Sequence, residues 1–96
     1  MSIEYNYVFK LEETDIATAE KRKIKRSYST ADKKRVSQIV ESILKTPFEG
    51  IGKPEPLKGD FRGYWSRRLK AKDRIIYKVE GDKVIVFHYL AHYKQK

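Results

Sequence analysis

The sequence predicts an α+β fold in which one or two N-terminal helices pack against a mostly antiparallel sheet, in two layers. Two observations lead to this fold class. Residues 29–44 repeat apolar side chains at helical spacing, and residues 61–93 contain three segments rich in β-branched and aromatic residues, separated by short turns. With 96 residues, the chain is expected to form one domain, 1–96, around one hydrophobic core.

The first part of the chain predicts a strand followed by a helix. Residues 5–10, YNYVFK, are aromatic and β-branched and short enough for a first strand. Residues 12–26 begin acidic and end basic, an order that complements the helix macrodipole. Their apolar stripe of Ile16, Ala19 and Ile24 is sparse, so a basic arm that orders only on a partner is the alternative to the favoured helix.

The second helix has clear start and stop signals. Ser29 followed by Asp32 resembles a capping box in which Asp replaces the usual Glu or Gln. Thr46-Pro47 disfavours continuation of the helix, and the glycines that follow permit turns. A loop is therefore expected over about residues 47–59. The apolar stripe of this helix consists of Val36, Ile39, Val40, Ile43 and Leu44.

The remainder predicts three strands. They are expected over residues 61–69, 74–80 and 83–93. Residues 71–73 and 81–82 form the turns between them, and the last two strands should pair as an antiparallel hairpin. Residues 84–90 are apolar on both faces apart from His88, as expected of a central strand covered on one side by helices.

Composition restricts the classes of function. The chain has 22 Lys and Arg against 13 Asp and Glu, a net charge of +9, which favours a polyanionic partner such as nucleic acid over an ordinary basic surface. The absence of cysteine excludes disulfides and thiolate-bound zinc and fits a cytoplasmic protein. No run of about 18 apolar residues and no apolar leader is present, so neither membrane insertion nor secretion is expected.

The most informative segment is residues 46–68, TPFEGIGKPEPLKGDFRGYWSRR. It places Glu55 between two prolines, which bias its backbone toward extended conformations, and follows it with Lys58, Arg67 and Arg68. A carboxylate can take a proton from an attacking hydroxyl while guanidinium groups hold phosphate oxygens. Without those basic neighbours, a solvent-facing loop carboxylate would be the simpler interpretation.

Alternation along the strands separates the basic candidates. Arg67 shares a face with Trp65 and is expected to point toward the core, so Arg68, beside Tyr64, is the better candidate to face a ligand. Arg74 follows a turn, where its side chain can project into a groove or simply into water.

His92 is the natural proton donor, because an imidazole can protonate a leaving alkoxide near neutral pH. The alternative is a partly buried histidine at a strand end. His88 lies four residues earlier. On a strand that spacing is about 13 Å, too far for both to ligate one ion, so neither a metal nor another cofactor is expected.

The motifs PFEG, GKPEPLK and WSRR, followed by a strand containing Arg74 and a late His92-Tyr93 pair, resemble the YoeB/Txe toxins of the RelE superfamily. The resemblance covers roughly residues 32–93. It implies the two-layer fold of RelE-like toxins, of microbial-RNase type. Two departures are Asp73 before Arg74, where the family often has histidine, and the Lys94-Gln95-Lys96 tail after the tyrosine.

The resemblance also implies roles and partners. Glu55 aligns with the general base, Arg74 with the arginine on the scissile phosphate, His92 with an active-site histidine, and Tyr93 with a tyrosine that orients substrate. The candidate substrate-binding residues are Lys58, Arg67, Arg68, Tyr64 and Trp65. The implied function is a type II toxin that acts as a metal-independent, ribosome-dependent mRNA endonuclease, using the ribose 2′-hydroxyl as nucleophile. The implied partners are the ribosome with its mRNA and a YefM/Phd-type antitoxin, with DNA contacted only through the antitoxin complex and a homodimer as an option.

Two other classes remain open at this stage. One is a non-catalytic basic RNA-binding module that stacks bases on Tyr64, Trp65 and Tyr93. The other is an inactivated toxin that serves as a protein-interaction component by binding an antitoxin.

Overall fold

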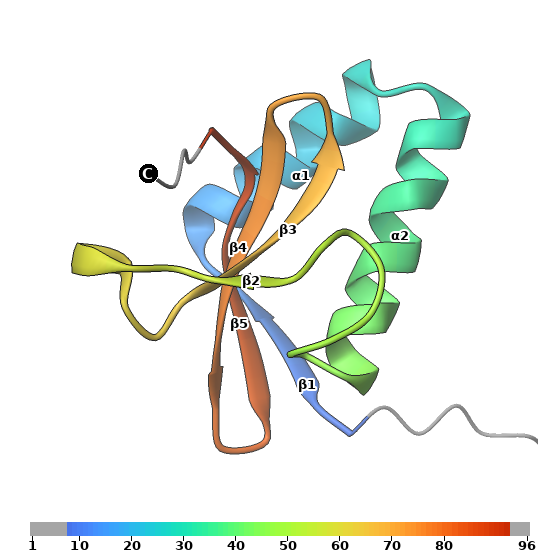
Figure 1. Cartoon of the computed structure of the whole chain (residues 1–96). Coiled ribbons are helices and arrows are strands. Elements are labelled where there is room, and N and C mark those ends of the chain that lie inside the picture. The colour runs from blue at the N-terminus through green and yellow to red at the C-terminus, as the bar shows by residue number, and fades with distance from the viewer. Residues whose placement is uncertain (1–7, 93–96) are drawn as a thin grey trace, which may run out of the picture.

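The computed structural model describes residues 8–92, and within them two helices cover one face of a five-stranded sheet (Figure 1). The elements follow in the order β1 (Lys10–Glu13), α1 (Asp15–Ser27), α2 (Thr30–Lys45), β2 (Glu55–Pro56), the 3-10 helix η1 (Gly59–Phe61), β3 (Trp65–Lys70), β4 (Asp73–Glu80) and β5 (Lys83–Ala91). Across the sheet the strands are ordered β1-β5-β4-β3-β2, and β1 runs parallel to β5 while the other pairs are antiparallel. The predicted α+β fold is confirmed.

The first helix forms as predicted but starts later. Thr14 caps α1 by accepting a hydrogen bond from the Ala17 backbone N–H at 3.1 Å, and Lys25 and Arg26 lie in the last turn. Glu12, where the prediction began the helix, belongs instead to β1. The parallel pairing of β1 with β5 therefore determines where the helix can begin.

The prediction of the first strand is wrong in its position. Of the predicted residues 5–10, the structure describes only 8–10, and among these only Lys10 belongs to β1, which runs on to Glu13. Phe9 lies in a bend and donates its backbone N–H to the Leu44 carbonyl at 3.2 Å. Pairing of Lys10 with Lys83 fixes the register of this edge strand.

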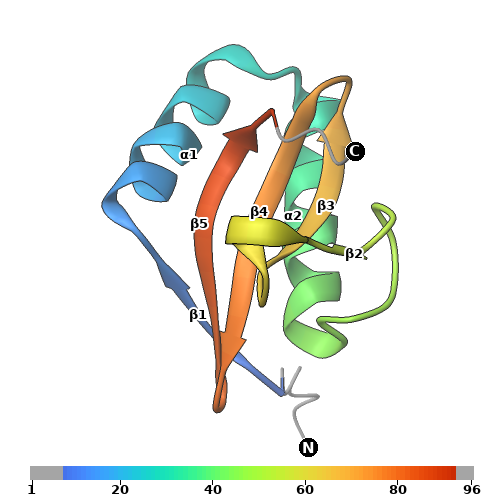
Figure 2. The ribbon, with the colours of Figure 1, turned by 60° about the vertical axis from the view of Figure 1, so that its left-hand side comes forward.

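The prediction of α2 is confirmed. Ser29 caps the helix by accepting from the Asp32 backbone N–H at 3.1 Å. Figure 2 places α2 behind β3 and β4. The buried side chains of its predicted stripe belong to the core cluster that also contains side chains of the sheet. They are Val36, Ile39, Ile43 and Leu44. Neither helix in the described part of the chain is long and apolar enough to cross a membrane.

The antiparallel hairpin of β4 and β5 is confirmed, and β5 lies between β4 and β1 inside the sheet. β5 ends at Ala91, and residue 93 of the predicted strand lies outside the described residues. β3 starts at Trp65 rather than at the predicted residue 61, because the preceding segment turns on itself: the Tyr64 N–H donates to the Phe61 carbonyl at 3.0 Å.

The predicted loop over residues 47–59 contains a short strand. Glu55 and Pro56 form β2 and pair antiparallel with Ser66 and Trp65 of β3. β2 is therefore the outer strand next to β3, and it places Glu55 on the sheet rather than in a free loop.

A continuous core fills the space between the helices and the sheet. Its fully buried members include Tyr77 and Tyr89, whose rings contribute large apolar areas. The Tyr89 hydroxyl and Lys21 Nζ both donate to Glu13. Although burial opposes ionisation, these two donors hold the pKa of the Glu13 carboxyl below its usual range. A polar contact thus ties β1, α1 and β5 together.

Candidate active site

The sheet face turned away from the helices carries three of the predicted charged residues. Glu55 of β2 is directly opposite Ser66 of β3, and Arg68 of β3 is directly opposite Arg74 of β4. Side chains of residues that face each other across an antiparallel pair lie on the same face, and so do side chains two residues apart on one strand. Glu55, Arg68 and Arg74 therefore share one face over three adjacent strands.

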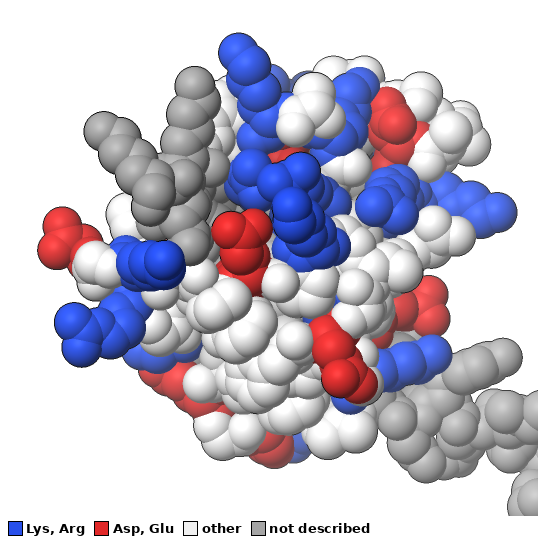
Figure 3. Space-filling model, in the orientation of Figure 1, with Lys and Arg blue, Asp and Glu red and all other residues white. Residues whose placement is uncertain are grey.

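These groups are available to a ligand. Among the described residues, the side chains of Glu55, Arg68 and Arg74 have no hydrogen-bond or ion-pair partner. Glu55 and Arg74 are half-buried and Arg68 is exposed. Figure 3 views the molecule from the same side as Figure 1, and Lys and Arg side chains gather there beside an acidic side chain.

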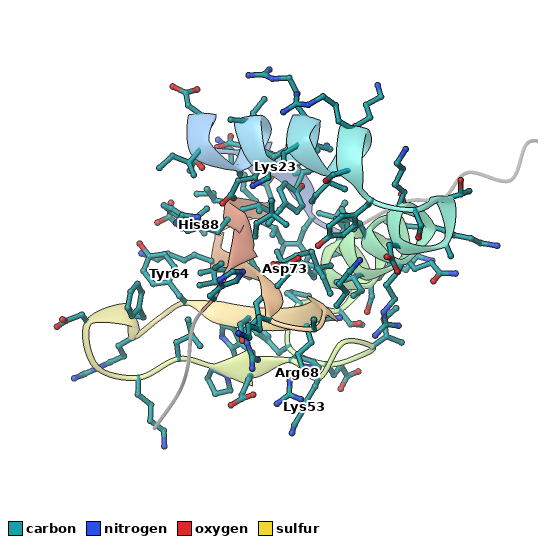
Figure 4. The ribbon with its side chains drawn as sticks, turned by 90° about the horizontal axis from the view of Figure 1, so that it is seen from above. Lys23, Lys53, Tyr64, Arg68, Asp73 and His88 are labelled. Carbon is teal, nitrogen blue, oxygen red and sulfur yellow. The ribbon has the colours of Figure 1, made fainter. Side chains whose placement is uncertain are left out.

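The two arginines form a like-charged pair across the strands. Like charges directly opposite each other destabilise a sheet, and a bound anion removes that cost by pairing with both. Lys53 adds charge here, since Figure 4 shows Lys53 and Arg68 together on the side of the sheet away from α1. Lys53 has a backbone φ of +53°, a left-handed conformation that costs a side-chain-bearing residue about 1–3 kcal/mol.

His92 lies just beyond β5 and is held by a carboxylate. Its Nε2 is 2.9 Å from Asp73 Oδ1, and the Tyr28 hydroxyl donates to Asp73 Oδ2 at 2.5 Å. Burial and the hydrogen bond to Asp73 raise the pKa of Tyr28, which keeps the phenol a neutral donor. With Nε2 engaged, Nδ1 is the imidazole nitrogen left for other contacts, and the side chain is 61% exposed.

His92 lies near the sheet face that carries Arg68 and Arg74, but it does not bond either arginine in the described part of the chain. Arg74 pairs with Ala91, the residue before His92, so the histidine follows the strand position beside the arginine. Asp73 and Arg74 are consecutive and point to opposite faces. No hydrogen bond or ion pair joins His92 to Glu55 or Arg74 in residues 8–92.

The imidazole lines a pocket at the end of the sheet. The pocket has a volume of about 390 Å³. Its lining comes from α1, the segment after it, β3, β4 and β5, and consists of Lys23, Ser27, Tyr28, Lys70, Asp73, Leu90 and His92. Lys70 Nζ is 2.9 Å from Asp32 and lies over the Tyr28 ring. Tyr93, the remaining predicted catalytic residue, lies outside the described residues.

The prediction that Arg67 binds substrate does not agree with its position in the structure. Arg67 has no exposed surface, and its guanidinium donates to groups inside the protein. Trp65 is partly buried and packs against the core with its ring 4.9 Å from that of Phe48, and its substrate-binding role stays a prediction. Alternation explains both results, because the two side chains lie on the helix-facing side of β3.

The other predicted binding residues lie at the surface beside the sheet. Lys58 is exposed and precedes η1. Tyr64 is half-buried and packs edge to face with Phe87 at 5.0 Å between ring centroids, while Lys78 Nζ lies 5.5 Å from its centroid. Tyr64 therefore offers only part of its ring to a ligand.

Sequence reasoning missed Tyr28 and the contact role of Asp73. Asp73 was visible only as a departure from the family pattern, and the Tyr28 to Asp73 bond joins residues 45 positions apart. Lys53 was also missed, because residues before proline favour extended rather than left-handed backbone.

His88 contacts a carboxylate of α1 and not the candidate site. Its Nδ1 is 3.3 Å from Glu20 Oε2, and Glu20 Oε1 accepts from the Tyr89 backbone N–H at 2.8 Å. Within residues 8–92, no group of three or more His, Cys, Asp or Glu side chains could hold a metal ion.

Comparison with solved structures defines the class of protein. The fold matches the YoeB/ParE toxin from Agrobacterium tumefaciens with a TM-score of 0.83 and 36% identity, covering 88% of this chain and all of that one (100%). It matches the YoeB dimer from Staphylococcus aureus with a TM-score of 0.80 and 26% identity, over 90% of this chain and 99% of that one. These likenesses place the chain among the RelE-type toxins.

Sequence comparison then gives the family. Toxin YoeB of Streptomyces coelicolor is 45% identical over 60 residues, which are 62% of this chain and 71% of that protein. Toxin YoeB of Escherichia coli K12 is 40% identical over 60 residues, with the same coverage of 62% and 71%. Residues 18–93 match the model of the YoeB-like toxin of bacterial type II toxin-antitoxin systems, and the chain belongs to this family. The resemblance read from the motifs is confirmed.

Proposed function

We propose that this YoeB-family toxin is a ribonuclease that cleaves mRNA engaged on the ribosome and thereby stops translation in the cytoplasm. The observation that carries the proposal is the shared sheet face of Glu55, Arg68 and Arg74, on which one carboxylate and two guanidinium groups have no partner among the described residues. An acid with a pair of cations suits a phosphodiester and is of little use to an uncharged substrate.

In the proposed reaction the ribose 2′-hydroxyl is the nucleophile. Glu55 accepts the hydroxyl proton as the 2′-oxygen bonds to phosphorus, the bond from phosphorus to the 5′-oxygen breaks, and His92 gives that oxygen a proton. The products are a 2′,3′-cyclic phosphate and a 5′-hydroxyl. DNA lacks the attacking group, and no metal is needed because side chains supply the base, the acid and the positive charge.

The arginines stabilise the charge that develops on the phosphorane oxygens. Arg74 lies between Arg68 on one side and Ala91, beside His92, on the other. A phosphate held by Arg74 is thereby close to the strand end that carries the imidazole. Preorganised positive charge at this position is among the largest contributions to catalysis of such reactions.

Ribosome dependence follows from what the small protein lacks. The 2′-oxygen attacks in line with the leaving oxygen, which requires a distorted RNA backbone, and among residues 8–92 this sheet face has few groups with which to impose that distortion. We propose that the ribosome holds the mRNA in the required geometry. The net charge of +9 suits docking on ribosomal RNA.

The proposal includes an inhibitory protein partner. A solved relative, 27% identical with a TM-score of 0.77 over 88% of this chain, is the YoeB-YefM toxin-antitoxin heterotetramer of Staphylococcus aureus, and another is a YoeB dimer. We propose that an antitoxin of YefM/Phd type covers the basic face of this chain, that the toxin forms a homodimer, and that DNA is contacted only through the antitoxin.

The test uses antitoxin-free protein and purified ribosomes programmed with a defined mRNA, followed by mapping of the new 5′ ends. Wild type is expected to cut, and Glu55→Gln to cut at least about 10²-fold more slowly with ribosome binding retained. Glu41→Gln, which changes an exposed carboxylate on α2, is the matched control and should cut like wild type. Binding without cutting by wild type would overturn the proposal and favour a non-catalytic RNA-binding module.

A further inference from the structure

Arg67 is a charged residue that reaches no solvent and no carboxylate among the described residues. Its exposed fraction is 0%. Nε donates to the Tyr77 hydroxyl at 3.1 Å, Nη1 to Ser42 Oγ at 2.6 Å and to the Ile51 carbonyl at 2.9 Å. Nη2 donates to the carbonyls of Thr46 at 2.7 Å and Glu49 at 2.8 Å. A guanidinium has five N–H groups, and each has an acceptor here.

Neutral oxygens therefore replace the water that an arginine normally holds. A buried charge costs several kcal/mol unless its donors are satisfied, so the folded state requires these acceptors to stay in place. Three of them are carbonyls of the segment that joins α2 to β2. The guanidinium in turn supplies a donor to each of these carbonyls.

Two further bonds fix the same segment. The Tyr77 hydroxyl, which accepts from Arg67, donates to the Pro47 carbonyl at 2.6 Å. The Arg68 backbone N–H donates to the Gly52 carbonyl at 2.7 Å. Between residues 46 and 52, five carbonyls are thus held by β3 and β4, and we call these seven residues the clamped loop.

The two glycines of the clamped loop make this wrapping possible. Gly50 has φ +122°, and a Cβ there would lie 2.3 Å from Ser42 Oγ and 3.1 Å from Arg67 Nη1. Gly52 has φ +83°, and its Cβ would lie 3.1 Å from the Arg68 carbonyl. Side chains rarely adopt such backbone angles, and here they would also collide with the clamp. The PFEG and WSRR motifs are therefore parts of one structural unit.

We infer that Arg67 is a positioning residue, whose guanidinium holds the clamped loop so that Glu55 enters β2 in a fixed orientation. Glu55 is three residues beyond Gly52, and its strand partner Ser66 is the residue before Arg67. The role assigned to Glu55 rests on the proposed function. The clamp itself does not, because it is defined by hydrogen bonds that can be broken without reference to catalysis.

Tyr77→Phe tests the inference with a small change, since it keeps the ring and removes the hydroxyl that links Arg67 to Pro47. Tyr89→Phe is the matched control. Tyr89 is equally buried, and its hydroxyl bonds Glu13 of β1, the edge strand at the other end of the strand order from β2. Arg67→Lys is the second variant, because one ammonium keeps the charge but cannot reach acceptors spread around a fork.

The first measurement is the rate at which a protease that cuts after glutamate cleaves the clamped loop. Glu49 lies in the clamped loop, and the bond after Glu55 is protected by Pro56. We expect Tyr77→Phe and Arg67→Lys to be cut after Glu49 at least about tenfold faster than wild type and Tyr89→Phe, at a temperature where all are folded. Equal cutting of Tyr77→Phe and Tyr89→Phe would overturn the clamp.

Cleavage of mRNA on programmed ribosomes is the second measurement. Tyr77→Phe is expected to lower the single-turnover rate about tenfold with the half-saturating ribosome concentration unchanged, and Tyr89→Phe to keep the rate. If Tyr77→Phe is cut faster by the protease but cleaves mRNA at the wild-type rate, the inference that the clamp positions Glu55 is refuted. If Glu55→Gln itself cleaves normally, the proposed function fails, while the protease result still decides the clamp.

Discussion

Replacing Asp73 with asparagine is expected to slow RNA cleavage far more than it destabilises the fold. Asp73 accepts two hydrogen bonds, from Tyr28 at Oδ2 and from His92 Nε2 at Oδ1. Asparagine keeps the side-chain volume but has only one acceptor oxygen. The amide oxygen can accept from only one of Tyr28 and His92, and the other group loses its acceptor.

The size of the effect follows from the exposure of the two contacts. A hydrogen bond to a charged group contributes about 1.5–3 kcal/mol. The Asp73 side chain is 21% exposed and His92 is 61% exposed, so the loss of stability should fall at the lower end of this range, about 1.5–2 kcal/mol. An imidazole without Asp73 can rotate out of place, and a misplacement of about 1 Å can cost up to about 10²-fold in rate.

The assay is single-turnover cleavage at saturating programmed ribosomes, together with thermal unfolding of the same samples. Asp73→Asn should cut about 10- to 100-fold more slowly and remain fully folded at the assay temperature. Asp82→Asn, an exposed acid in the turn between β4 and β5, is the control and should cut at the wild-type rate. Wild-type cleavage by Asp73→Asn would refute the view that this carboxylate positions the imidazole.

Three further outcomes are expected. Gly50→Ala should destabilise the protein to urea by about 2–4 kcal/mol, since strain and a clash add, whereas Gly63→Ala, with φ +94° but open space around it, should cost only about 1 kcal/mol. The pKa of Glu13 is lower in the folded state than in the unfolded state, so the carboxylate stabilises the fold at neutral pH and this stabilisation is lost as pH falls through the lowered pKa. Glu13→Gln should abolish this part of the acid dependence of Tm. Arg68→Ala and Arg74→Ala should each reduce the slope of log affinity against log salt by about 0.7 for single-stranded RNA without loss of stability; an unchanged slope would mean that neither contacts phosphate.

Local patterns were enough to predict α2 and most of the β4–β5 hairpin. Ser29 caps a helix because its own side chain reaches the Asp32 N–H three residues away, and such short-range signals are written in the sequence. The position of β1 could not be predicted in the same way. Its limits depend on the parallel pairing of Lys10 with Lys83, a partner 73 residues away along the chain.

In the candidate site, too, local patterns predicted some features, whereas contacts between distant residues were not predictable. Alternation predicted that Arg67 would face the core and Arg68 a ligand, and the structure confirms the burial of Arg67. The five acceptors around Arg67 were not predictable, since three of them are backbone carbonyls that carry no residue identity. The bond from Asp73 to His92 joins β4 to the residue that follows β5, and it depends on a register that no local pattern specifies.

The two dipeptides Arg67-Arg68 and Asp73-Arg74 explain how so small a sheet can both fold and present charge. Arg68 and Arg74 face each other across the strands on the open face, while Arg67 and Asp73 point the other way. Each inward residue bonds a segment that carries a proposed catalytic group: Arg67 holds the loop before Glu55, and Asp73 holds His92. The backbone of β3 and β4 thus connects the two arginines of the open face to both groups, and a shift of register in either strand would displace the proposed base, the proposed acid and the cations together.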